Sequence, residues 1–152
     1  MKFSTKDRYA LRLMAELAGR TEGAFISLKE ISETQQISVK YLEQIVIPLT
    51  RAGLLASGRG AQGGYRLTRS PAQITAGDVL RAMEGELNVI PCLGTGTDCP
   101  RRSCCDTLDF WNGLNAAIHQ YVDNVTLEDL KPAQQTPATA KISAPAQRGC
   151  AR

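Results

Sequence analysis

Two runs of sequence decide the fold of this chain, namely ISVKYLEQ at residues 37–44 and GRGAQGGYRL at residues 58–67. Ser38 is a favourable N-cap residue, so the first run predicts a helix from Val39 to about Ala52, with a kink at Pro48. Gly53 follows where a left-handed residue commonly ends a helix. In the second run a glycine-rich loop, too long for a two-residue turn, joins short expected strands at 54–57 and 65–67. The two runs together predict a recognition helix followed by a β-hairpin wing.

Two further helices are expected before the recognition helix. Ser4 or Thr5 can cap the first, whose apolar residues recur at helical spacing up to Ala18. The chain breaks at residues 21–23, and Ser27 with Glu30 then has the form of a capping box that opens the second helix. Three helices and a hairpin are the layout of a winged helix-turn-helix, so we expect a mainly α fold with a small β wing.

The chain after the wing has a different character. Thr75 can cap a fourth helix that runs through Met83, and a cysteine-rich loop follows it. A long amphipathic helix is expected from about Ser103 to Asp123, with a last helical turn at 125–130. The Pro-, Ala- and Gln-rich remainder is expected to be disordered, with Cys150 a bystander. We therefore divide the chain into a winged-helix head (1–70), a cysteine loop with its flanking helices (71–130) and a tail (131–152).

Charge is distributed unevenly along the chain. Residues 1–70 hold eleven Lys and Arg against six Asp and Glu, a net of +5, whereas residues 71–130 hold three against nine, a net of −6. The tail holds four basic residues and no acid, and the three parts sum to the overall +3. A basic head on an acidic body is typical of a head that binds nucleic acid phosphates.

Composition also restricts where the protein acts. No run of 18 or more apolar residues exists, and the start of the chain lacks the apolar region and cleavage site of a secretory signal. We expect a cytoplasmic protein with no membrane association. Thiols stay reduced in that compartment, so clustered cysteines are there more often metal ligands than disulfides.

The recognition helix offers side chains suited to double-stranded DNA. Residues 40, 43, 44 and 47 share one face, in or next to the first two turns, where such a helix meets base edges. Glu43 can accept a hydrogen bond from cytosine N4, and Gln44 can pair with adenine through two hydrogen bonds. Lys40 and Tyr41 are better suited to phosphates, next to the capping residue Ser38.

The wing offers a second kind of DNA contact. Arg59 stands between two glycines, so no neighbouring side chain obstructs its reach. An arginine on a slim hairpin suits the narrow, electronegative minor groove. Arg66 and Arg69 are candidates for phosphate contacts, which add affinity but little sequence information.

Four of the five cysteines lie within fourteen residues, at positions 92, 99, 104 and 105. The spacing differs from the paired C-x2-C motifs of a structural zinc ribbon. A loop of this kind leaves thiolates free to surround a polynuclear centre such as an iron–sulfur cluster. From spacing alone an iron–sulfur cluster, a zinc ion and a thiol redox switch all stay open.

The head, wing and cysteine loop together resemble the IscR-type (Rrf2) family of winged-helix iron–sulfur regulators. The resemblance covers about residues 1–130. It rests on the run 37–44, on Arg59-Gly60 followed by Gly63-Gly64-Tyr65, on the cysteine loop with Trp111, and on Val125-Thr126-Leu127. It implies a homodimer joined through the long helix, near-palindromic promoter DNA as the partner, and base contacts by Glu43, Gln44 and Arg59. It also implies a [2Fe–2S] or [4Fe–4S] cluster held by Cys92, Cys99 and Cys105.

The chain departs from the IscR pattern at the fourth cluster ligand. The pattern has a histidine three residues after the last cysteine, where this chain has Leu108. The only histidine, His119, lies roughly 21 Å further along a helix and is expected at the surface or an interface. Cys104 is the nearest substitute, and Asp7 from the partner subunit is another, by analogy with nitric-oxide-sensing relatives.

These features predict a cluster-sensing transcriptional regulator, a repressor of genes for iron–sulfur assembly or for iron, sulfur or redox homeostasis. An alternative is a cluster-free regulator of cysteine metabolism that responds to a partner protein or to thiol oxidation. A third possibility, a small redox enzyme, is disfavoured because the chain has no C-x-x-C motif and no histidine close to the thiols. We therefore expect no enzymatic activity and no small-molecule substrate.

Overall fold

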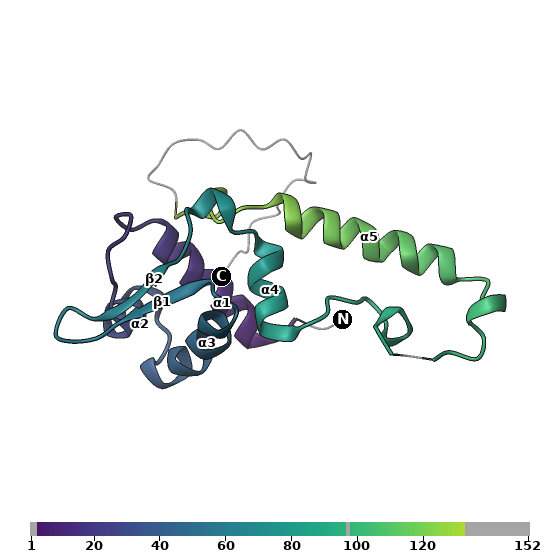
Figure 1. Cartoon of the computed structure of the whole chain (residues 1–152), viewed down its shortest axis with the longest axis horizontal. Helices are drawn as coiled ribbons and strands as arrows, with labels where there is room; N and C mark the ends of the chain where they lie inside the picture. The colour runs from purple at the N-terminus through teal and green to yellow at the C-terminus, as the bar shows by residue number, and fades with distance from the viewer. Residues whose placement is uncertain (1–2, 97, 133–152) are drawn as a thin grey trace, which may run out of the picture.

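The head of the protein begins with three helices, each with a serine N-cap. The structure is a computed structural model that describes residues 3–96 and 98–132. It contains α1 (Thr5–Ala18), α2 (Leu28–Gln35) and α3 (Val39–Arg51) (Figure 1). Ser4, Ser27 and Ser38 accept hydrogen bonds from backbone N–H groups in the first turns of these helices. The predicted caps are confirmed, and α3 continues through Pro48.

A two-stranded antiparallel hairpin follows α3. Strand β1 (Leu55–Gly58) pairs with β2 (Gly64–Leu67) in a register that places Leu55 opposite Leu67. Gly53 has a φ of +71° at the end of α3, as predicted. Ile26 adds a bridge to Tyr65, so the backbone before α2 runs beside β2. Gly64 permits this approach, because a Cβ there would lie 2.2 Å from the Ile26 carbonyl oxygen.

The fourth helix packs against the head. A short 3-10 turn η1 (Pro71–Gln73) leads to α4 (Ala76–Glu84), which is capped by Thr75. Ile74 and Val79 are fully buried in the same apolar core as α1, α2 and α3, and so is Leu127 near the C-terminal end. A bridge between Thr75 and Thr126 ties that end back to the start of α4. The core of the head therefore includes residues from both sides of the cysteine loop.

The rest of the described chain forms an arm that projects from the head (Figure 1). It contains the cysteine loop, with 3-10 turns η2 (Pro91–Leu93) and η3 (Arg102–Cys104), and the helix α5 (Leu108–Asn124). The predicted start of this helix near Ser103 was wrong, because the backbone of Cys105 is extended and separates η3 from α5. The expected helical turn at 125–130 is instead a bridge followed by a hydrogen-bonded turn, in which Thr126 and Asp129 bond to each other.

The architecture confirms the predicted fold class: mainly helical, with a small β wing, a cysteine loop and a long last helix. Within residues 3–96 and 98–132, no helix has the length and apolar character needed to cross a membrane. Cys150 and the rest of the tail beyond Pro132 lie outside the described residues, so the expectation of disorder there stays a prediction.

Candidate DNA-binding face and cysteine loop

The outward face of α3 carries the predicted base-reading side chains. Lys40, Glu43 and Gln44 are exposed. The opposite side of the helix provides the core, with four apolar residues that are at most 2% exposed: Leu42, Ile45, Val46 and Leu49. The structure thus brings the predicted contact residues of α3 onto one free face. Their roles at DNA stay predictions.

The start of α3 is fixed by local contacts and surrounded by positive charge. The Ser38 hydroxyl accepts a hydrogen bond from the Tyr41 N–H at 3.3 Å. The Tyr41 ring packs edge-on against Tyr9 of α1, with ring centroids 5.5 Å apart. The guanidinium groups of Arg8 and Arg12 lie 6.0 and 5.5 Å from the Tyr9 ring centroid. A basic patch that sequence reasoning did not single out therefore lies beside the start of the recognition helix.

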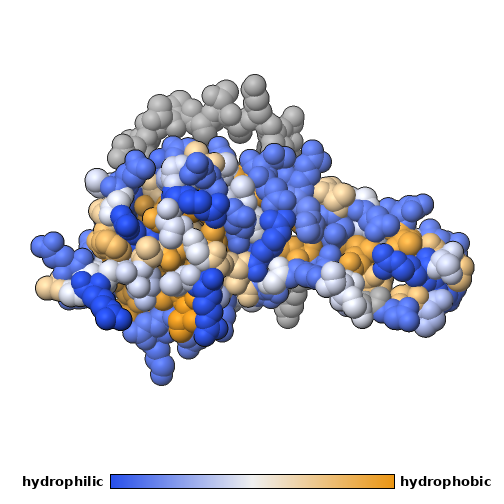
Figure 2. Space-filling model, in the orientation of Figure 1, coloured by the Kyte–Doolittle hydropathy of each residue, from blue (hydrophilic) through white to orange (hydrophobic). Residues whose placement is uncertain are grey.

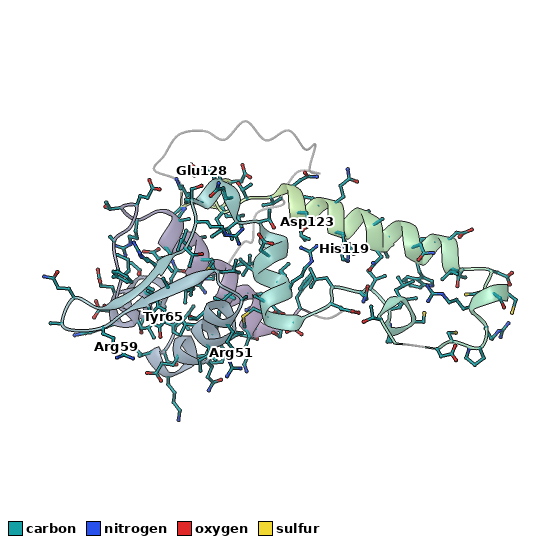
Figure 3. All side chains as sticks on the ribbon, in the orientation of Figure 1. Arg51, Arg59, Tyr65, His119, Asp123 and Glu128 are labelled. Atoms are coloured by element: carbon teal, nitrogen blue, oxygen red, sulfur yellow. The ribbon has the colours of Figure 1, made fainter. Side chains whose placement is uncertain are left out.

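The wing presents Arg59 at its tip (Figure 3). Arg59 is exposed, and no described residue forms a hydrogen bond or ion pair with its guanidinium group. Arg66, on β2, lies with its guanidinium carbon 4.9 Å from the centroid of the Phe25 ring. This cation–π contact holds Arg66 at the base of the hairpin, whereas Arg59 stays free to reach outward.

The cysteine loop is folded on itself by polar contacts. Arg102 donates a hydrogen bond to the Cys92 carbonyl oxygen at 2.8 Å, which connects η3 to η2. The Glu86 carboxylate accepts hydrogen bonds from the backbone N–H of Thr95 at 3.1 Å, from its hydroxyl, and from the Asn88 amide. The bonds from Thr95 lower the pKa of Glu86. The carboxylate therefore holds the loop in a closed turn after Cys92.

The thiols of this loop are partly accessible. Cys92, Cys99 and Cys105 are half-buried and Cys104 is exposed, and all four are free thiols. Among the described residues, no three His, Cys, Asp or Glu side chains lie close enough together to hold a metal ion. The donor type suits an iron–sulfur cluster. The single chain does not by itself gather the three predicted ligands.

The thiol of Cys105 lies beside hydrogen-bond donors of Thr107. Its sulfur lies 3.5 Å from the Thr107 hydroxyl oxygen. Hydrogen bonds from the hydroxyl and the backbone N–H of Thr107 lower the pKa of Cys105, and the neighbouring charge of Asp106 acts in the opposite direction. Thr107 therefore favours the thiolate, which is the form that binds metals and reacts with oxidants.

Two residues bear on the fourth ligand of the predicted cluster, namely Leu108 and Asp7. Leu108 opens α5 and has no donor atom. Asp7 is only 1% exposed, and one of its carboxylate oxygens accepts a hydrogen bond from the Ser4 N–H at 2.5 Å. Its other oxygen, Oδ1, has no hydrogen-bond partner among the described residues. A buried carboxylate oxygen without a partner is costly, so Asp7 has capacity for one more interaction.

A polar network connects α5 to α4. Arg81 on α4 donates two hydrogen bonds to the Asp123 carboxylate, at 2.6 and 2.8 Å (Figure 3). The same guanidinium group lies 3.3 Å from His119 Nδ1, and His119 Nε2 lies 2.7 Å from the Leu87 carbonyl oxygen. The hydrogen bond from Arg81 is the main cause of the lowered pKa of Asp123. His119 is therefore a half-buried residue that links α5 to α4 and to the entry of the cysteine loop.

Asn115 continues the network toward the cysteine loop. Its side-chain oxygen accepts a hydrogen bond from the Val89 N–H at 3.0 Å, and its amide lies 3.4 Å from the Asn88 side chain. Together with His119 and Asp123 it recurs every four residues, so the three side chains line one face of α5. We call this set the α5 polar ladder. Its spacing was visible in the sequence, but its partners on α4 and the loop were not.

The opposite face of α5 is apolar and exposed. Phe110, Leu114 and Tyr121 are 64%, 38% and 58% exposed, and at about 100° per residue they point within 40° of one another. Hydrophobic side chains gather on the arm in Figure 2. Beside them lies a groove of about 640 Å³ between α5 and the head, lined mostly by apolar side chains that include Leu11, Leu80, Ile118, Tyr121 and Leu130.

Comparisons with known proteins agree with this architecture. Residues 3–133 match the Rrf2 family, described as iron-dependent transcriptional regulators. The chain is 42% identical to the transcriptional regulator CymR of Bacillus subtilis over 130 residues, which are 86% of this chain and 89% of that protein. It is 38% identical to IscR of Vibrio vulnificus, covering 86% and 77% of the two chains.

Solved structures of two relatives are also similar to the structure of this chain. The structure of CymR, the global cysteine regulator of B. subtilis, matches with a TM-score of 0.71 and 41% identity, over 86% of this chain and 95% of that one. That of T. potens IscR matches with a TM-score of 0.69 and 36% identity, over 91% and 94%. The relatives are regulators and not enzymes, as expected. The chain is thus a DNA-binding winged-helix transcriptional regulator and belongs to the Rrf2 family.

Proposed function

We propose that this protein is a cluster-sensing transcriptional regulator that binds promoter DNA as a homodimer and acts as a repressor in the cytoplasm. The observation that carries the proposal is the set of three partly accessible thiols, Cys92, Cys99 and Cys105, in one folded loop on the arm. Relatives named IscR support this assignment. Its target genes are proposed to serve iron–sulfur assembly or iron, sulfur or redox homeostasis.

DNA recognition is proposed to use α3 and the wing together. Glu43 and Gln44 are exposed on the outward face of α3, and Lys40 adds positive charge near its start. Arg59 extends the contact beyond the major groove because it lies at the end of the hairpin. Footprinting on a candidate promoter would test the binding site. Transcription assays on the same promoter would test the sign of regulation.

The homodimer is proposed to form through the exposed apolar face of α5. Phe110, Leu114 and Tyr121 are exposed, although Phe110 packs edge-on against the neighbouring Trp111, and an exposed apolar stripe of this kind beside a groove is typical of an interface. We expect sedimentation at micromolar concentration to show a dimer. The substitution Leu114→Glu should shift the equilibrium toward monomer, because dimerisation would then bury the glutamate charge. Gln120→Glu, an exposed change off this face, is the matched control, and a monomeric wild type contradicts the proposal.

In the proposed loaded state, Cys92, Cys99 and Cys105 hold the cluster as thiolates. The cluster supplies a centre that responds to iron, oxygen or nitric oxide. Cys104 and the partner subunit's Asp7 are the two proposed sources of the fourth ligand. The unpartnered Oδ1 of Asp7 supports the second, while the position of Cys104 beside Cys105 supports the first.

The α5 polar ladder is proposed to link the loop to the head. The entry of the cysteine loop, Leu87 and Val89, is bonded to His119 and Asn115. Asp123, one turn beyond His119, holds Arg81 on α4, and α4 packs on the head. A change in loop conformation therefore acts on the element that supports α3. Coupling of this kind is reciprocal, so operator DNA must also alter the affinity of the loop for its ligand.

The ladder has an expected dependence on pH. Because the pKa of Asp123 is lowered in the folded protein, the stability that it contributes is present at neutral pH and is lost as the pH falls through its folded pKa, below about 4. Asp123→Asn is expected to cost about 1 kcal/mol or less at pH 7, since the pair is exposed to solvent, and to cost less at pH 3, where part of the charge on Asp123 has been lost.

Thermal unfolding of wild type and Asp123→Asn at both pH values measures this difference. Glu22→Gln is the control, because Glu22 is exposed and forms no ion pair within the described part of the chain. An equal loss for Asp123→Asn at pH 7 and pH 3 contradicts the assignment of the effect to the charged pair with Arg81.

A second candidate function is a cluster-free regulator of cysteine metabolism. Two observations favour it: Leu108 stands where a histidine ligand is expected, and the chain is 42% identical to CymR. In that case the loop thiols respond to oxidation or to a partner protein. Cys105 is suited to such a response because Thr107 favours its thiolate.

Oxygen-free purification followed by iron, zinc and acid-labile sulfide analysis separates the two functions. The cluster-sensing proposal expects iron and sulfide in comparable amounts, with visible absorption. Colourless protein with no metal, together with retained promoter binding, supports the cluster-free regulator. Protein that contains zinc alone contradicts the cluster-sensing proposal.

A further inference from the structure

We propose that Ile47 is a specificity-determining residue, whose side chain packs against the C5-methyl group of a thymine in each operator half-site. Ile47 is 50% exposed, although it is a large apolar residue in the middle of α3. The inference rests on the proposed docking of α3 in the major groove, and it adds to the polar contacts of Glu43 and Gln44 an apolar contact of different chemistry.

The position of Ile47 on the helix places it at the centre of the reading face. At about 100° per residue, Glu43 lies 40° to one side of Ile47 and Gln44 lies 60° to the other. Arg51, in the following turn, lies about 40° away and is exposed. Ile47 is therefore flanked by polar groups suited to base edges and to phosphate. When α3 docks in the major groove as proposed, the Ile47 side chain therefore faces the bases.

The Ile47 side chain is not part of the buried core of the head. The other apolar residues of the middle and end of α3, which are Leu42, Ile45, Val46 and Leu49, are all at most 2% exposed. An exposed isoleucine by itself is common and needs no role. Its location between two candidate base-reading residues is what distinguishes Ile47 from a scattered surface residue.

The surroundings of Ile47 suit DNA better than a protein partner. It borders a shallow hollow of about 290 Å³ between α3 and the hairpin, which has the buried Val46 in its lining and is otherwise shared with the cation Arg51 and the hydroxyl-bearing residues Thr50, Ser57 and Tyr65. Positive charge and hydroxyl donors are the groups that contact the sugar–phosphate backbone. An apolar protein interface would need a contiguous patch, and the neighbours of Ile47 on this face are polar. These surroundings favour a contact of Ile47 with a base, with the neighbouring residues in contact with the sugar–phosphate backbone.

Thymine is the base that an isoleucine can recognise in the major groove. Its C5-methyl group is the apolar feature presented there, and aliphatic side chains read it by van der Waals contact. Burial of one methyl group is worth about a fourfold change in affinity. A thymine contacted by Ile47 is therefore expected to bind several-fold more tightly than deoxyuridine, which lacks only this methyl group.

The test begins with an operator selected by the wild-type protein from random duplex DNA. Each thymine of one half-site is then replaced in turn by deoxyuridine, and affinities are measured at fixed salt for wild type, Ile47→Ala and Val39→Ala. Val39 is the matched control because it is exposed on the same helix but lies at the edge of the face. We expect one position where uracil weakens wild type and Val39→Ala about fourfold but leaves Ile47→Ala unchanged.

Two results would overturn the assignment. Either no thymine shows sensitivity to loss of its methyl group, or the sensitivity persists undiminished in Ile47→Ala. Gln44→Ala separates these results from a failure of the proposed docking. If Gln44→Ala loses sequence preference while Ile47→Ala does not alter uracil sensitivity, α3 still reads DNA and only the Ile47 contact is refuted. If neither variant alters sequence preference, the docking itself is refuted. Thermal unfolding verifies that each variant is folded.

Discussion

Replacement of Cys92, Cys99 and Cys105 together by alanine is expected to abolish visible iron–sulfur absorption and to leave the fold intact. The three thiols are the soft donors that such a cluster requires. None of them belongs to either buried apolar cluster of the protein, so their removal leaves no cavity in the core. We expect a loss of iron and sulfide to background in oxygen-free preparations, with thermal unfolding close to that of apo wild type.

The adjacent thiol provides the matched control for this experiment. Cys104→Ala removes an exposed cysteine from the same loop, next to Cys105. If Cys104 is a bystander, iron and sulfide contents stay at wild-type level, whereas a reduced content identifies it as the fourth ligand. Asp7→Asn tests the other source of that ligand. Retention of the iron–sulfur absorption in the triple variant contradicts the assignment of the ligands.

The same variant separates sensing from DNA binding. The thiols lie on the arm, and the predicted base-reading residues lie on the head, so the triple variant should still bind the operator. Its affinity is expected to equal that of apo wild type under all redox conditions. Loss of all DNA binding, with the fold retained, would mean that the loop acts on the head in a way that the α5 polar ladder does not explain.

Local signals in the sequence predicted most of the head. Each capping residue lies within three positions of the N–H group that it binds, so Ser27, Ser38 and Thr75 could be recognised without any tertiary information. The wing could also be predicted from the sequence, because glycine is common where a turn needs a positive φ angle. Gly60 and Gly64 both have such angles in the structure. These elements are determined by interactions between near neighbours in the chain.

The arm was less predictable because its structure depends on distant partners. The sequence predicts a start of α5 near Ser103, but the 3-10 turn η3 and the extended backbone of Cys105 occupy that stretch, and Arg102 ties it to the Cys92 carbonyl. Arg81 and Asp123 are 42 residues apart, so the ladder could not be derived from the spacing on α5 alone. The sequence predicted an amphipathic helix here, but which of its apolar residues face the head and which are exposed could be seen only in the fold.

Replacement of Arg59 by alanine is expected to weaken operator binding about 10- to 100-fold while leaving the protein folded. Arg59 is exposed at the tip of the hairpin, and no described residue binds its guanidinium group, so its loss costs the folded state little. At DNA the same freedom allows it to enter the minor groove, where a narrow A·T-rich segment concentrates negative potential. We also expect the preference for A·T at that position to disappear.

Titration of operator binding at several salt concentrations distinguishes this role from a general loss of charge. Loss of one cationic contact lowers the slope of log affinity against log salt by about one, so Arg59→Ala, which removes one contact from each subunit of the proposed homodimer, should lower it by about two. Arg101→Ala removes the same charge from the exposed cysteine loop and should leave both affinity and slope nearly unchanged. Arg59→Lys should keep the slope but lose part of the A·T preference, since lysine keeps the charge without the planar fork. Equal effects of Arg59→Ala and Arg101→Ala would contradict a wing contact, and binding would then depend on the overall charge of the protein.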